Sequence, residues 1–206
     1  MTHKKLNYLL ISLISLLLCV LIFSTVARAE DWSWMAQGGV KVNSARSKGY
    51  DVGYGIQAEA GLRWRFLEGR LYADYMSESK QDAEWGRHYT VTPELRGYFY
   101  DSFYAVGAYK MAGYWSEFSN GTVWEKHGAN WGFGGGYNSG DTEVQLVYFL
   151  REHASPNKVQ ATVLKVQQRV WQGLFITAGG SYETWEQDGE RWSGPTFNMG
   201  AVWRFE

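Results

Sequence analysis

Apolar and polar residues alternate through most of the chain after its first thirty positions. The clearest stretch is 54–66, thirteen residues whose apolar face consists of Tyr54, Ile56, Ala58, Ala60, Leu62, Trp64 and Phe66. The other face consists of Gly55, Gln57, Glu59, Gly61, Arg63 and Arg65. A period of two indicates a β-strand, and this length suits a tilted strand that spans a membrane. The pattern recurs at 88–99, 143–151 and 196–205.

Strand and turn signals together predict an all-β chain of ten antiparallel strands. We place the strands at 32–43, 51–66, 69–79, 86–100, 102–116, 123–138, 141–152, 158–171, 173–186 and 191–205. Short turns are expected at 67–70, 100–102, 138–141 and 171–173, and longer polar loops at 44–50, 79–86, 117–122, 152–158 and 186–191. This alternation is typical of a closed transmembrane β-barrel with short periplasmic turns and longer extracellular loops. Eight strands are the main alternative, because 102–116 and 158–171 alternate ambiguously.

The aromatic residues distinguish a membrane barrel from a soluble β-sandwich with the same alternation. A sandwich would carry its tryptophans in the middle of its strands, whereas a barrel places them where strands cross the two membrane interfaces. Here the aromatics gather near the predicted strand ends. The expected interface residues are Trp32, Trp64, Phe66, Trp85, Trp115, Trp124, Trp171, Trp185, Trp192, Trp203 and Phe205. The sequence therefore favours an apolar outer wall and a polar interior.

The N-terminal 29 residues read as a signal peptide rather than as part of the barrel. Lys4 and Lys5 precede an apolar run from Tyr8 to Val26, and Ala27-Arg28-Ala29 matches a signal-peptidase site. We expect residues 1–29 to be removed and residues 30–206 to form one barrel domain in the outer membrane of a Gram-negative bacterium. The apolar run is 19 residues long, so an uncleaved anchor is the alternative.

Charge and cysteine content narrow the function further. After residues 1–29 are removed, 17 basic and 21 acidic residues remain, a formal charge of −4 without a basic run, which argues against nucleic-acid binding. Cys19, the single cysteine, lies in the predicted signal peptide, which excludes disulfides and thiolate metal sites from the mature chain. We expect neither a cofactor nor a metal ion.

These features resemble the small outer-membrane β-barrel proteins of Gram-negative bacteria, of the OmpA/OmpX-like type in the broad sense. The resemblance rests on architecture over residues 30–206 and on the last strand, which alternates from Phe197 to Phe205. In that group the barrel-assembly machinery recognises the closing strand. The resemblance therefore implies two partners for this chain, the barrel-assembly machinery and outer-membrane lipid. This chain departs from the pattern at its end, because Glu206 follows the aromatic residue.

The polar face predicts a charged lumen. Its expected lining residues are Gln57, Glu59, Arg63, Arg65, Asp74, Glu94, Arg96, Glu143, Arg151, Lys165, Arg169, Glu183 and Arg204. Buried charges must pair, so acids and bases are expected to bind one another across strands. The lumen is then either filled by this network, giving a structural barrel, or left as a small passive pore for polar solutes. Glycines at 128, 132, 134 and 136 are expected to leave room beside them for arginine side chains or water.

Other function classes have weaker signals. An omptin-like protease would need acids and a histidine at the extracellular mouth, for which Asp82, Glu84, His88, His127 and His153 are available. His153-Ala154-Ser155 has the H-x-S spacing of lipid A-modifying hydrolases, but it lies in a predicted loop. A surface-binding or adhesive barrel would use the charged segment 77–85. We expect a non-enzymatic barrel.

Overall fold

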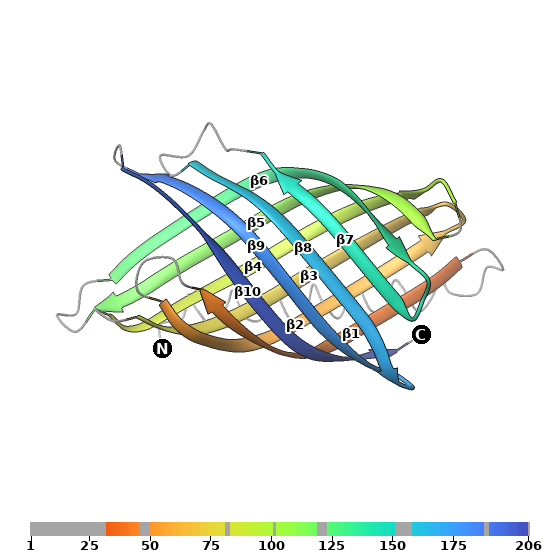
Figure 1. Cartoon of the computed structure of the whole chain (residues 1–206), viewed down its shortest axis with the longest axis horizontal. Coiled ribbons are helices and arrows are strands. Elements are labelled where there is room, and N and C mark those ends of the chain that lie inside the picture. The colour runs from red at the N-terminus through yellow and green to blue at the C-terminus, as the bar shows by residue number, and fades with distance from the viewer. Residues whose placement is uncertain are drawn as a thin grey trace, which may run out of the picture.

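The computed structural model describes residues 32–45, 50–80, 83–100, 102–118, 123–150, 158–187 and 190–205. These residues form ten strands: β1 (Trp32–Ala45), β2 (Tyr50–Trp64), β3 (Leu67–Lys80), β4 (Ala83–Tyr98), β5 (Phe103–Phe118), β6 (Val123–Asn138), β7 (Thr142–Phe149), β8 (Lys158–Trp171), β9 (Leu174–Gln187) and β10 (Glu190–Phe205). Figure 1 shows them as one tilted, closed sheet. The ten-stranded prediction is confirmed, and the eight-stranded alternative is wrong.

Each strand pairs antiparallel with its neighbours in sequence, and β1 pairs with β10 to close the barrel. The closing register runs from Ala36 opposite Phe205 to Ala45 opposite Thr196. Every strand therefore has a partner on both sides, as a sheet in lipid requires, although β7 pairs with β6 only over the residues from Gly132 to Asn138. The predicted signal peptide, residues 1–29, lies outside the described residues.

Several strand ends differ from their predicted places. The connection between β2 and β3 is at residues 65–66 rather than 67–70, with Arg65 at a φ of 54°. Gly69, which falls in both the predicted turn 67–70 and the predicted strand 69–79, lies within β3, opposite Leu62 of β2 and Leu95 of β4. At the other end, β3, β4, β9 and β10 continue into the segments expected as the loops 79–86 and 186–191. We call the end with connections 65–66, 99–102, 139–141 and 172–173 the turn end, and the opposite one the loop end.

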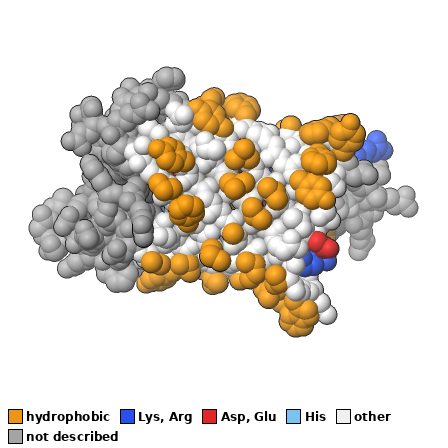
Figure 2. All heavy atoms as spheres, viewed as in Figure 1, with side chains coloured by type: hydrophobic (Ala, Val, Ile, Leu, Met, Phe, Trp, Pro, Cys, Tyr) orange, Lys and Arg blue, Asp and Glu red, His pale blue; other side chains and the backbone are white. Residues whose placement is uncertain are grey.

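The sheet is apolar outside and polar inside. Outward side chains such as Ile56, Leu95 and Leu146 are 63%, 62% and 52% exposed. Figure 2 shows such apolar side chains spread over the barrel wall. Inward polar residues are buried instead, as with Gln37 and Gln167. This arrangement is the inverse of a soluble sandwich and fits a wall that faces lipid.

Aromatic side chains gather on the outside at the turn end. Exposed there are Trp64, Phe66, Phe99, Tyr100, Phe103, Trp171, Trp203 and Phe205. Trp32 stacks on Trp64 with ring centroids 5.8 Å apart. The side chains of Trp85, Trp115, Trp124, Trp185 and Trp192 lie outside those the structure describes. That aromatic belts mark the two membrane interfaces stays a prediction. No helix in the described part of the chain is long and apolar enough to cross a membrane.

Candidate functional site: the charged lumen

The inward face carries most of the predicted lumen residues. Those on it are Gln57, Glu59, Arg63, Asp74, Glu94, Arg96, Glu143, Lys165, Arg169, Glu183 and Arg204. Arg65 is not among them, because the chain has already left β2 and enters the turn there. Its side chain is exposed, with the guanidinium carbon 5.3 Å from the Trp64 ring. Arg151 lies outside the described residues.

Two buried arginines organise the centre of the site. Arg70 binds three carboxylates: its Nη1 lies 2.7 Å from Glu59 Oε1 and 2.9 Å from Glu143 Oε2, and its Nε lies 2.7 Å from Glu68 Oε1. Arg96 binds Glu143 Oε1 at 3.1 Å and Glu94 Oε2 at 2.8 Å through its Nη2. Glu143 therefore bridges the two guanidinium groups. We call Glu59, Glu68, Arg70, Glu94, Arg96, Glu143 and Lys165 the charged plug.

The charged plug crosses the lumen instead of following its wall. Arg70 of β3 meets Glu143 of β7, although β4, β5 and β6 lie between these strands in the sheet. Glu59 of β2 meets Lys165 of β8 at 2.7 Å, although β1, β10 and β9 separate those strands. The side chains of Arg96 and Glu143 are each only 1% exposed. Opposite walls are thus joined by ion pairs inside a closed space.

Neutral polar groups complete the hydrogen bonds of the carboxylates. The Tyr98 hydroxyl donates to Glu68 at 2.6 Å, and the Gln145 amide donates to Glu94 at 2.9 Å. The Gln37 amide donates to Glu59 at 2.7 Å and in turn accepts a hydrogen bond from Gln167 at 2.8 Å. A buried ion network is tolerated when its remaining lone pairs are satisfied in this way.

Further ion pairs lie toward the loop end. Lys41 Nζ lies 2.7 Å from Asp74 Oδ2, which also accepts a hydrogen bond from the Tyr72 hydroxyl at 2.8 Å. Lys110 Nζ lies 3.7 Å from a Glu183 carboxylate oxygen, with both side chains less buried than those of Arg96 and Glu143. A cavity of about 10 Å³ lies beside the charged plug, and its lining includes Gln37, Gln57, Glu59, Tyr72, Lys165 and Thr177. That is the room needed for about one water molecule.

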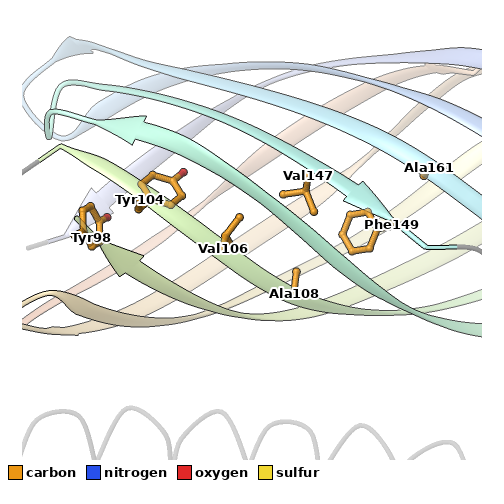
Figure 3. Packing of buried hydrophobic residues seen from close by; sticks show 7 residues of the cluster. All are labelled: Tyr98, Tyr104, Val106, Ala108, Val147, Phe149 and Ala161. Atoms are coloured by element: carbon orange, nitrogen blue, oxygen red, sulfur yellow. The ribbon is translucent and has the colours of Figure 1, made fainter. Parts of the chain in front are cut away.

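An apolar cluster fills one side of the lumen, which sequence reasoning did not foresee. It consists of Tyr98, Tyr104, Val106, Ala108, Val147, Phe149 and Ala161, contributed by β4, β5, β7 and β8 (Figure 3). The glycines of β6 were expected to leave room for arginine or water, and that expectation is wrong at two positions. The Tyr104 ring lies over Gly136 and the Phe149 ring over Gly132. Aromatic rings use the space that the missing Cβ atoms provide.

We expect the variant Gly132→Ala to lower the free energy of unfolding by about 1–3 kcal/mol, the usual cost of overpacking. A Cβ at this position would lie 2.7 Å from Phe149 Cδ1 and 2.9 Å from Val147 Cγ1, so these buried side chains would have to move. The measurement is urea unfolding of the refolded barrel in lipid vesicles. Gly107→Ala is the control, because nothing lies within 4 Å of a Cβ at that outward position. Equal costs for the two variants would contradict this packing.

Glu68 and Arg70 are the most important residues that sequence reasoning missed. Both fall in the predicted turn 67–70, and Arg70 also falls in the predicted strand 69–79, but neither was named as a lumen residue. The signal that could have placed them is the alternation itself, since Leu67, Gly69 and Leu71 continue the outward face of β3 while 68 and 70 are buried. Lys41, Tyr72 and Gln37 were also missed, although Gln37 lies directly opposite the predicted lumen residue Glu59 and Tyr72 lies two residues from the predicted lumen residue Asp74.

The two histidines that the structure describes, His88 and His127, do not lie at one site. His88 belongs to the inward face of β4, whereas His127 is exposed on the outward face of β6 and contacts the Tyr89 hydroxyl at 3.3 Å. Asp82 and His153 lie outside the described residues, and the side chain of Glu84 outside the described side chains. Within the described residues, no group of three His, Cys, Asp or Glu residues could hold a metal ion.

An apolar wall around a buried, charged lumen decides the class of this protein. The chain is a small β-barrel of the outer-membrane type. It is similar to the crystal structure of Neisserial surface protein A, with 15% identity, a TM-score of 0.46, and coverage of 85% of this chain and 98% of that one. It is also similar to Ail, the attachment invasion locus protein of Yersinia pestis, with 13% identity, a TM-score of 0.40, and coverage of 86% and 100%.

A third similar structure is the translocator domain of the autotransporter NalP from Neisseria meningitidis, with 14% identity, a TM-score of 0.40, and coverage of 86% and 90%. No protein-family model matches the chain, and no curated protein matches it. Membership of the OmpA/OmpX-like type in particular stays a prediction.

Proposed function

We propose that this barrel is a structural, non-enzymatic protein of the Gram-negative outer membrane whose lumen is sealed by the charged plug. The observation that carries the proposal is the pair of ion contacts between opposite walls, Arg70 with Glu143 and Glu59 with Lys165. A passive pore requires a continuous file of water through the barrel. The described lumen instead holds side chains that are almost completely buried, and a cavity with room for about one water molecule.

Charge balance supports a plug that stays in place. Arg70, Arg96 and Lys165 face Glu59, Glu68, Glu94 and Glu143. The three cations of the plug thus offset most of the charge of its four carboxylates, and a further cation, Arg204, donates a hydrogen bond to the side-chain oxygen of Gln37 at 3.2 Å. Removal of one partner would leave a buried charge without compensation, so thermal motion rarely separates a single pair.

The placement of the two described histidines shows only that they cannot act together in one site. A water-activating site needs an acid and a histidine within hydrogen-bond reach on the same side of the wall. His88 and His127 lie on opposite faces of the sheet. Export through residues 1–29 and recognition of β10 by the barrel-assembly machinery stay predictions, as does any adhesive role of the connections at the loop end.

We expect the folded barrel to be silent in a planar lipid bilayer. The charge-neutral double variant Arg70→Ala/Glu143→Ala should give discrete openings, because it removes both halves of a contact across the lumen. The control is Asp141→Ala/Arg169→Ala, which removes an ion pair of 3.1 Å at the turn end whose side chains are 66% and 35% exposed. This control should stay silent. Reproducible openings of the unchanged, folded protein would contradict the sealed lumen and favour a passive pore.

A further inference from the structure

One cation lies on the apolar outer wall. Among the described side chains, Arg87 is the single charged residue on the outward face of a strand, and it is exposed. Along β4, the outward positions below it carry Tyr89, Val91, Pro93 and Leu95. No described residue forms an ion pair or hydrogen bond with its guanidinium group. An exposed guanidinium group in this position can bind an anionic group from outside the barrel.

Arg87 lies next to a built polar contact. Tyr89, Gly113 and His127 are consecutive partners across β4, β5 and β6. The Tyr89 ring lies over Gly113, where a Cβ would come within 2.6 Å of its Cζ. The glycine therefore lets the Tyr89 hydroxyl reach His127 Nδ1 at 3.3 Å, with the two ring centroids 6.3 Å apart. A hydroxyl and an imidazole are thus held side by side one row below the guanidinium.

The position of Arg87 along the strand matches the level of lipid headgroups. It lies 11 residues before Tyr98, where β4 ends near the exposed aromatic residues of the turn end. At about 3.3 Å per residue and a strand tilt of about 40°, this places Arg87 roughly 28 Å from that end. The apolar band of a membrane barrel is about 25 Å tall. Arg87 is therefore just beyond the apolar band, in the leaflet at the loop end.

We propose that Arg87, supported by Tyr89 and His127, binds the phosphate group of an anionic lipid in this leaflet. A guanidinium group binds phosphate oxygens through two parallel hydrogen bonds, and a hydroxyl and an imidazole supply further polar contacts. The acyl chains of the lipid would run down the wall over Val91, Pro93 and Leu95. This inference rests on the proposed membrane location but not on the sealed lumen.

The test is retention of a phosphorylated lipid by the folded barrel. The protein is reconstituted in phosphatidylcholine vesicles that contain lipid A, extracted gently into detergent, and analysed by native mass spectrometry for bound lipid A. We expect Arg87→Gln to reduce retention roughly tenfold, as the loss of a charge-assisted hydrogen bond predicts. Arg87→Lys should keep part of the binding, and lipid A without its phosphates should be retained as poorly as by Arg87→Gln.

The matched control is Arg65→Gln, which removes an exposed cation from the turn at the opposite end and should leave retention unchanged. Far-ultraviolet circular dichroism establishes that each variant is folded. Equal retention by the unchanged protein and Arg87→Gln would overturn the site, and so would equal retention of lipid A with and without phosphates. Bilayer conductance reports separately on the plug, because Arg87 lies outside the lumen and its substitution leaves the lumen intact.

Discussion

Replacing Arg70 with alanine is expected to lower the free energy of unfolding by about 3–5 kcal/mol, the cost of breaking a buried ion network from one side. The substitution removes a guanidinium group that binds Glu59, Glu68 and Glu143 within 2.9 Å. Glu59 would keep Lys165 and Glu143 would keep Arg96, but Glu68 would be left with the Tyr98 hydroxyl and the more distant Arg96 at 3.9 Å. Urea unfolding of the refolded barrel in vesicles, followed by tryptophan fluorescence, measures the loss.

Asp141→Ala is the comparison for this substitution. It also removes one partner of an ion pair, but Asp141 is 66% exposed and its carboxylate is largely solvated. Exposed pairs contribute about 0–1 kcal/mol, so this variant should unfold almost as the unchanged protein does. If Arg70→Ala costs no more than Asp141→Ala, then the lumen is hydrated and the plug is not a buried network.

The sequence predicts which residues of each strand face the lumen, because with a period of two each strand can present only one of two alternating sets of residues inward. Once one residue of a strand is placed inside, all those at even spacing follow, and a slip of one would turn every apolar side chain inward. This is why Glu59, Arg96 and Glu143 were predicted as lumen residues from sequence. The prediction failed at Arg65, where the strand ends, because alternation cannot show where a strand stops.

The partners within the lumen could not be predicted in the same way. Glu59 and Lys165 are 106 residues apart in sequence, and their contact depends on the circumference and register of the closed barrel. The same holds for Arg70 and Glu143. The glycines of β6 show the same limit. Alternation predicts that they face inward, but it cannot predict that the rings of Tyr104 and Phe149, which come from the neighbouring strands, cover them.

A charge added to the outer wall near the membrane midplane should destabilise the barrel about as much as the loss of a charge from the lumen does. Leu146→Arg is expected to lower the free energy of unfolding by about 2–4 kcal/mol, the cost of an arginine facing lipid near the membrane midplane. Leu146 is 52% exposed on β7 and lies four residues from Thr142, where the strand begins. At about 3.3 Å per residue and a tilt of about 40°, it lies roughly 10 Å from the turn end, close to the middle of the apolar band.

Arginine substitutions at two other outward residues of the same segment are the controls for this prediction, because these residues lie nearer the two membrane interfaces. Val144 is closer to the turn end and Leu150 closer to the loop end, and both are exposed. Arginine near an interface costs about 0–1 kcal/mol, since the guanidinium group can reach the headgroups. Urea unfolding of the three variants in the same vesicles should therefore give a loss that peaks at position 146. A loss of the same size at all three positions would mean that this wall does not face the hydrocarbon of a bilayer.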